Sequence, residues 1–296
     1  MRQARFLLGW VDDNIATLTF ANNQTGVPLT ADQSVRLKQA RATVRQRLVR
    51  HEPGNVINNK LPNEVQTHVS ALQQSGAANA YWAEGWQVVM ADLRQVCGIQ
   101  PLIFVDHAEE RVAAVNPDDA GDIAKVTLPL PTSINLQPQY DTMQKAWIID
   151  TPNLNFQILA PYYGQVPTPA TQAVPGQPAI NQPEQSQLVF GFVVGAHNSF
   201  LQVAKFHGKY VLRDGNHRAY ALLRRGISIV PALFREFGPH QELGVGPAGL
   251  LQAEAYLGER PPLLTDYLDD TVSIEVAVPA PQRIIVIPGL QLSQNK

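Results

Sequence analysis

The sequence predicts an α+β fold, in which a mixed sheet with flanking helices follows a mainly helical N-terminal part. Early segments carry apolar residues at helical spacing, whereas later runs are rich in β-branched and aromatic residues. The 296 residues are 45% hydrophobic and 16% charged, which is typical of a soluble globular protein with a large core. Basic and acidic side chains nearly balance, at a net charge of -2, so no global charge favours binding to nucleic acid or to an anionic membrane.

The N-terminal region, residues 1–78, contains two predicted helices, residues 31–50 and 62–75, the second ending before Gly76. The first also carries a basic surface made of Arg36, Lys38, Arg41, Arg45, Arg47 and Arg50. No recognition-helix motif or interleaved aromatic residue accompanies these cations. We therefore interpret the surface as solvated, although a phosphate-contacting role stays open.

The expected core, residues 79–240, begins with two strand-like segments at 86–93 and 101–107. An uncharged insertion rich in proline and glutamine follows at about residues 161–187, where we expect no regular structure. A binding loop and a tolerated surface insertion are both compatible with it. The remaining residues, 241–296, predict a helix followed by two strands that extend the core as a hairpin.

The segment from residue 200 to 234 predicts a hairpin, a turn, a helix and a strand in that order. His207 and Gly208 form the hairpin turn, Gly215 marks the change from strand to helix, and Gly226 ends the helix. A residue without Cβ permits both a sharp change of direction and the close approach of a ligand.

The tetrapeptide Gly215, Asn216, His217 and Arg218 therefore predicts a phosphate site at a helix start. The first amides of a helix lack internal partners and attract anions, and an arginine adds a planar fork of donors. The preceding Asp214 fits this chemistry as a cap, as a carboxylate behind a metal ion, or as a catalytic base.

The stretch "LQVAKFHGKYVLRDGNHRAYALLRRGISIVPALF" resembles the N-terminal domain of the ParB partition family and its relative sulfiredoxin. Gln202 lies where that family has a glutamine before the first hairpin strand, and Gln100 with Pro101 is similar to the end of its opening strand. The resemblance implies a nucleotide-binding fold that holds phosphates with residues 215–218. A third branch of this fold, which phosphorylates free serine, uses a similar turn.

Two departures limit what the resemblance implies. The partition family has Gly-Glu-Arg-Arg in this turn, and sulfiredoxin has a cysteine where Asn216 stands, so the thiolate chemistry of sulfiredoxin is disfavoured. The lone Cys97 is interpreted as a buried, inert thiol. No helix-turn-helix is evident after Phe234, so binding to nucleic acid is not favoured.

The functional hypothesis is accordingly a protein that binds a nucleotide or another phosphorylated small molecule, with a nucleotide triphosphate and Mg²⁺ as expected cofactors. A phosphotransferase or nucleotide hydrolase with Asp214 as base is the alternative. The second alternative is an interaction module without catalysis, which associates with nucleic acid or protein. Asp266, Asp269 and Asp270 form either a magnesium site or a solvated acidic turn. No apolar run spans a bilayer, so a cytoplasmic protein is expected, and a homodimer stays open.

Overall fold

Helices and strands are intermixed in the computed structural model, which confirms the predicted α+β fold class. The structure describes residues 1–49, 53–131, 138–144, 146–151, 156–166, 187–196, 199–239, 250–279 and 283–288. The helices are α1 (Asp13–Phe20), α2 (Ala31–Gln46), α3 (Asn63–Ser75), α4 (Asn79–Ala83), α5 (Val105–Val112), α6 (Ala120–Thr127), α7 (Asn216–Arg224) and α8 (Ala253–Leu257). The strands are β1 (Arg2–Phe6), β2 (Ile57–Asn58), β3 (Gln87–Asp92), β4 (Leu102–Phe104), β5 (Gln139–Asp141), β6 (Ala146–Thr151), β7 (Phe156–Val166), β8 (Gln187–Ala196), β9 (Gln202–Phe206), β10 (Lys209–Asp214), β11 (Ile229–Glu236), β12 (Ile274–Val278) and β13 (Arg283–Pro288).

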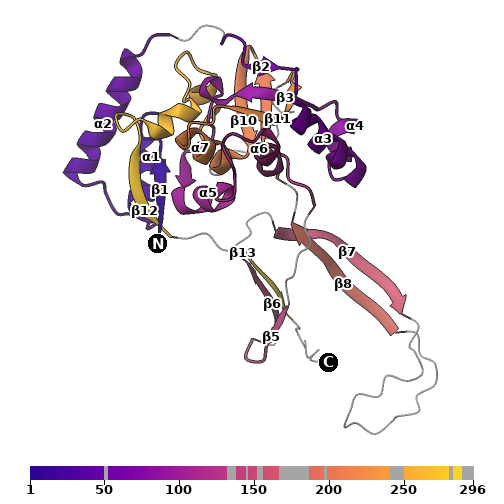
Figure 1. Cartoon of the computed structure of the whole chain (residues 1–296). Coiled ribbons are helices and arrows are strands. Elements are labelled where there is room, and N and C mark those ends of the chain that lie inside the picture. The colour runs from indigo at the N-terminus through magenta and orange to yellow at the C-terminus, as the bar shows by residue number, and fades with distance from the viewer. Residues whose placement is uncertain are drawn as a thin grey trace. The chain divides into compact units, whose positions relative to one another are not determined.

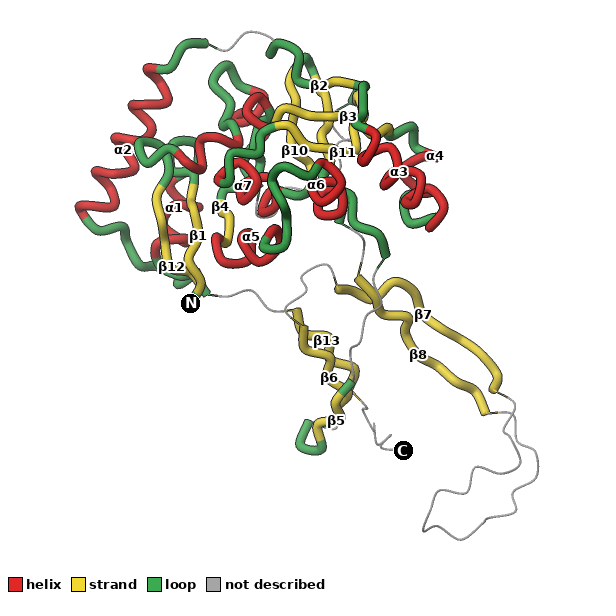
Figure 2. The backbone as a smooth tube through the Cα atoms, in the orientation of Figure 1, coloured by secondary structure: helices red, strands yellow, loops and turns green. Residues whose placement is uncertain are grey.

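The chain divides into two units, and the boundaries differ from the expected ones at residues 78 and 240. The first unit combines residues 1–131 with 198–280, and the second combines 132–197 with 281–296. The N-terminal region is not separate, because β1 pairs on one side with β4 and on the other with β12, near the opposite end of the chain (Figure 2). The strand β1 was not predicted.

The predicted hairpin, turn, helix and strand are confirmed in the first unit (Figure 1). They belong to a five-stranded sheet of order β10-β9-β11-β3-β2. His207 and Gly208 both have positive φ, 49° and 73°, as the tight turn between β9 and β10 requires. Helix α7 then connects β10 to β11, which pairs in parallel with β9.

The second unit contains a two-stranded ribbon, β7 with β8, and a sheet of order β13-β6-β5. The expectation that residues 161–187 lack regular structure is wrong at both ends, since β7 extends to Val166 and β8 begins at Gln187; residues 167–186 lie outside the described part. Pro161 is accommodated because each strand of a two-stranded ribbon has one edge that needs no donor. The hairpin expected near the C-terminus is also wrong, because β12 joins β1 and β13 joins β6.

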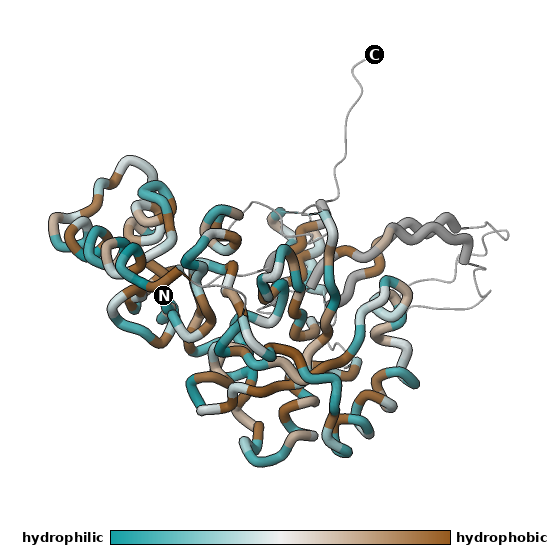
Figure 3. Tube along the Cα trace, turned by 90° about the horizontal axis from the view of Figure 1, so that it is seen from above, coloured by the Kyte–Doolittle hydropathy of each residue, from teal (hydrophilic) through white to brown (hydrophobic). Residues whose placement is uncertain are grey.

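Apolar side chains from strands and helices form the core of the first unit. Leu93, Val203 and Leu222 are among the fully buried residues. Along the tube in Figure 3, hydrophobic stretches are short and alternate with hydrophilic residues. In the described ranges, no helix combines the length and the apolar character needed to cross a membrane.

The basic surface expected on residues 31–50 is neutralised in part by contacts within the protein. Arg41 donates to the Asp13 carboxylate at 2.7 Å and to the Val11 carbonyl. Arg47 donates to Asp266 at 2.8 Å and to Asp269 at 3.0 Å. Arg50 lies outside the described residues.

These contacts also revise the expected acidic turn. Asp266 is only 5% exposed rather than solvated, and it shares Arg47 with Asp269. Asp270 pairs with Arg5 at 2.8 Å. Asp266 and Asp269 are thus tied to Arg47, whereas Asp270, whose side chain is 85% exposed, is a solvated carboxylate as one of the two alternatives expected. The described residues contain no cluster of three or more metal-binding side chains.

Candidate functional site

The start of α7 is shaped by Gly215, which adopts φ 90° and ψ 18°. This left-handed conformation turns the chain from β10 into the helix. A Cβ at this position would lie 3.1 Å from both Cα and Cγ of Leu201. Glycine is thus required here by the backbone conformation and by the close approach of the neighbouring strand segment.

Three consecutive amides at this helix start lack an acceptor. The carboxylate of Asp214 accepts the N–H of Gly215 at 2.6 Å, and the N–H of Ala219 donates to the Gly215 carbonyl at 2.9 Å. The intervening amides of residues 216–218 have no hydrogen-bond partner among the described residues. Asp214 therefore caps the turn through the Gly215 amide, and the next three amides of the helix start stay available to an anion.

Arg218 points into the protein and holds three oxygen atoms. Its guanidinium donates to the Val126 carbonyl at 2.9 Å, to the Ser199 carbonyl at 2.6 Å and to the Ser199 hydroxyl at 2.8 Å. The side chain is only 4% exposed, and burial lowers its pKa to about 10, so it stays charged at neutral pH. This position differs from the expected one, in which the guanidinium faces a phosphate.

Asp214 and Arg218 are linked through Ser199. The Ser199 hydroxyl donates to Asp214 at 2.8 Å while it accepts from Arg218. Tyr81 lies close enough that Asp214, after burial, contributes to raising the tyrosine's pKa. Gln202, the residue that carried part of the family resemblance, donates to the Tyr81 hydroxyl at 3.2 Å. Asp214 thus occupies a polar cluster with both carboxylate oxygens engaged.

The ring of His217 packs against two aromatic rings, one from the end of β4 and one from α5. It stacks on Phe104 at 5.8 Å between ring centroids and meets His107 edge to face at 5.3 Å. Its Nε2 atom is buried without a hydrogen-bond partner among the residues that the structure describes. Burial, more than the neighbouring charges, lowers the pKa of His217 to about 3, so the ring is neutral at pH 7.

His107 and Phe104 were not predicted to contribute to this site. Residues 101–107 read as one strand, whose alternation would place Asp106 and His107 on opposite faces. The strand β4 instead ends at Phe104, and α5 begins at Val105, which turns His107 toward α7. The basic residue Arg111 one turn later on α5 was missed for the same reason.

Arg111 is the cation that the site leaves uncompensated. Its side chain is exposed and makes no ion pair within the described part of the chain. Helix α5 packs against α7 through His107, and the charge of Arg111 contributes, after burial, to lowering the pKa of His107, of His217 and of Arg218. An exposed cation on α5 and amides at the start of α7 without partners in the described ranges are both groups that an anion can pair with.

No protein-family model, curated protein or solved structure matches the chain. Of the expected residues, Gly215 and the amides of residues 216–218 line the helix start. Asn216 is buried, 7% exposed, with an Oδ1 atom that has no partner in the described ranges.

Acidification is expected to destabilise the protein through His217. The unfolded histidine binds a proton below about pH 6.5, but the folded one resists protonation down to about pH 3. Below pH 6.5 the unfolded state therefore holds more protons, and the free energy of unfolding falls with pH by up to about 1.4 kcal/mol per unit for this group. Denaturant titrations between pH 7 and 4.5 would measure the slope.

His217→Gln should reduce that slope by nearly one proton. An identical slope in wild type and His217→Gln would contradict the assignment of the lowered pKa to this ring.

Proposed function

We propose that the start of α7 binds the phosphate groups of a nucleotide triphosphate or of another phosphorylated small molecule. The observation that carries the proposal is the row of three amides at residues 216–218 that have no partner among the described residues, on a helix that packs against α5, the helix of the exposed Arg111. The helix dipole and the amides favour an anion at this position, and the arginine supplies a charged donor. The resemblance to the ParB and sulfiredoxin families at residues 215–218 supports the same ligand class.

Within this proposal the expected residues have different roles. Gly215 allows the ligand to approach the backbone, and Asn216 and His217 contribute their amides and neighbouring side chains. Arg218 positions the helix start through its contacts with Val126 and Ser199, in addition to offering its own amide. A nucleotide triphosphate would bring Mg²⁺ with it, and Asp214 is the carboxylate nearest in sequence to this turn.

Turnover of the bound nucleotide is the second candidate function. It is favoured by one observation, the hydrogen bond from the Ser199 hydroxyl to Asp214 at 2.8 Å. A carboxylate that accepts a hydrogen bond from a hydroxyl group is placed as a general base would be. Phosphate transfer or hydrolysis would then need Asp214, whereas simple binding would not. Binding to nucleic acid is not favoured, because Arg41 and Arg47 of the expected basic surface pair with carboxylates and Arg36 donates to the Asp270 carbonyl.

Calorimetric titration of the four nucleoside triphosphates with Mg²⁺, and of pyrophosphate, tests the binding proposal. Arg111→Gln should weaken the bound ligand about ten-fold, since an exposed charged donor contributes near the lower end of the usual range of roughly 1.5 to 3 kcal/mol. The exposed Lys60 is outside the cluster, so Lys60→Gln should bind as wild type does. No binding at millimolar ligand, or equal affinity in Arg111→Gln, would contradict the proposal.

Phosphate release from the same mixtures separates the two functions. If Asp214 acts as base, Asp214→Asn should retain binding and lose turnover. Binding without phosphate release from the wild type would leave this site as a binding module.

A further inference from the structure

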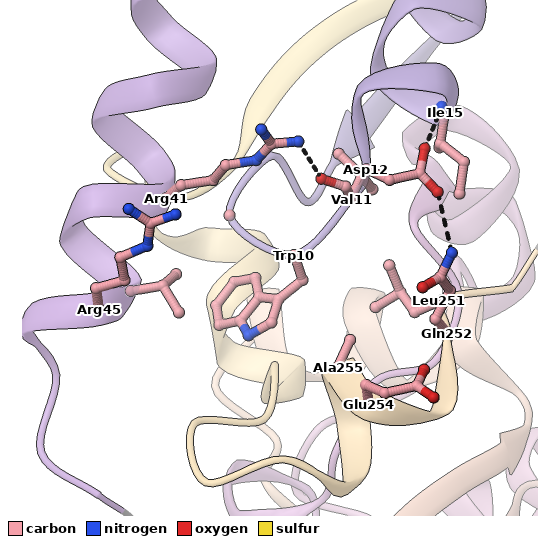
Figure 4. A pocket seen from close by; sticks show the side chains of 12 residues that line it. Trp10, Val11, Asp12, Ile15, Arg41, Arg45, Leu251, Gln252, Glu254 and Ala255 are labelled. Atoms are coloured by element: carbon pink, nitrogen blue, oxygen red, sulfur yellow. Dashed lines mark hydrogen bonds between the residues drawn. The ribbon is translucent and has the colours of Figure 1, made fainter.

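A cleft of about 380 Å³ lies in the first unit, apart from the start of α7 (Figure 4). Its walls come from the segment after β1 with the start of α1, from α2, and from the segment that leads into α8 with the start of that helix. None of its lining residues belongs to the cluster around α7, so the cleft is independent of the proposed phosphate site.

The floor of the cleft is apolar and fixed. The Trp10 indole donates to the Arg260 carbonyl at 2.7 Å, and the Arg47 guanidinium lies 5.2 Å from its ring centroid. Val44 and Leu251 are both buried and line the same cleft. A rigid tryptophan flanked by aliphatic side chains offers an apolar ligand a surface that loses little conformational freedom on binding.

Four charged side chains surround this floor, and two of them are already satisfied. Arg41 is held by Asp13 and by the Val11 carbonyl. Both carboxylate oxygens of Asp12 are engaged, one with the Ile15 amide at 2.7 Å and the other with Gln252 at 3.2 Å. These groups therefore shape the cleft rather than await a ligand.

The remaining charges are Arg45 and Glu254, one of each sign. Both are exposed, and neither makes a hydrogen bond or ion pair with any residue in the described ranges. Figure 4 places them on opposite sides of the Trp10 ring. The cleft thus separates a free cation from a free anion across an apolar surface.

We propose that this cleft is a second ligand site, which binds a zwitterion of dipeptide size with apolar side chains. The ligand carboxylate pairs with Arg45, its ammonium group pairs with Glu254, and its side chains lie on Trp10 and Leu251. The charged lining residues, Arg41, Arg45, Asp12 and Glu254, sum to zero, which suits a molecule with no net charge and separated ends. A phosphate or a nucleotide would instead meet the uncompensated Glu254 carboxylate.

Three forms of one dipeptide test this proposal by calorimetry: phenylalanyl-leucine, its C-terminal amide and its N-acetyl derivative. The wild type should bind the free dipeptide, and removal of either charge should weaken binding about ten-fold, as expected for loss of one charged hydrogen bond. In Arg45→Gln the acid and the amide should bind equally. In Glu254→Gln the free and the acetylated amine should bind equally.

Lys38→Gln is the matched control, because Lys38 is an exposed cation on the same helix that does not line the cleft. It should show the wild-type affinity for all three forms. The substituted side chains are exposed, so thermal melting should show that each variant is folded as the wild type is. Two results would overturn the proposal. One is that phenylalanyl-leucine does not bind at millimolar concentration, and the other is that the wild type binds the free dipeptide, its amide and its acetyl derivative with equal affinity. Tighter binding of the capped forms would also overturn it, and would indicate an internal peptide segment as the occupant.

Discussion

Replacing Arg218 by alanine is expected to lower the free energy of unfolding by about 3 to 5 kcal/mol, the range for removing one partner of a buried charged network. The guanidinium donates to two carbonyls and one hydroxyl, and it is only 4% exposed. Alanine would leave the Val126 and Ser199 carbonyls without these donors and would open a cavity beneath α7. Denaturant-induced unfolding at pH 7 measures the loss.

Arg224→Ala provides the comparison for this prediction, because it removes the same side chain from the same helix. Arg224 is half exposed and approaches Glu109 at 3.4 Å, so its loss should cost under about 1 kcal/mol. If Arg218→Ala were as mild as Arg224→Ala, the guanidinium would have to be free of its contacts with Val126 and Ser199. It would then be available to a phosphate, as the sequence predicts.

Gly215→Ala is expected to destabilise the protein by about 2 to 4 kcal/mol, the sum of a left-handed alanine and an overpacked contact. The residue has φ 90°, and a Cβ would lie 3.1 Å from the Leu201 backbone, which cannot move as a flexible side chain does. The effect should be visible in thermal unfolding without any ligand. Substitution of Gly215 therefore cannot be used to test phosphate binding, since a loss of affinity would follow from misfolding of the turn.

Gly226→Ala measures the cost of a left-handed alanine without the cost of a close contact. The φ of Gly226 is 80°, but nothing lies within 4 Å of the position that a Cβ would take, so Gly226→Ala should carry only the conformational cost of about 1 to 2 kcal/mol. Equal destabilisation by the two substitutions would mean that the contact with Leu201 contributes nothing. If Gly226→Ala destabilised the protein more than Gly215→Ala does, the added cost assigned to the contact with Leu201 would be contradicted.

Local patterns in the sequence predicted the elements around the site well. The change from strand-like to helical spacing at Gly215, and the glycine that ends the helix at Gly226, predicted β10, α7 and β11. Each of these signals acts within a few residues of the element that it determines. The same is true of α3, which ends before Gly76 as expected.

Contacts between distant segments could not be predicted. Arg218 is held by Val126 and Ser199, whose positions depend on how α6 and the segment before β9 pack, and no local pattern encodes this. The apolar, β-branched run before Asp106 likewise fits a strand, although packing against α7 favours the helix α5. The role of Arg111 follows only from that helix.

The pairing of β1 with β12 has a consequence for how the chain folds during synthesis. Arg2 lies opposite Val278, so β1 is synthesised long before the strand that it pairs with. At about 5 to 20 residues per second, roughly 15 to 55 s pass between their synthesis. During this time β1 has only β4 as a neighbour, and its other edge can pair with a foreign strand. One edge of β1 in the sheet β12-β1-β4 is therefore open to aggregation on the ribosome until β12 has been made.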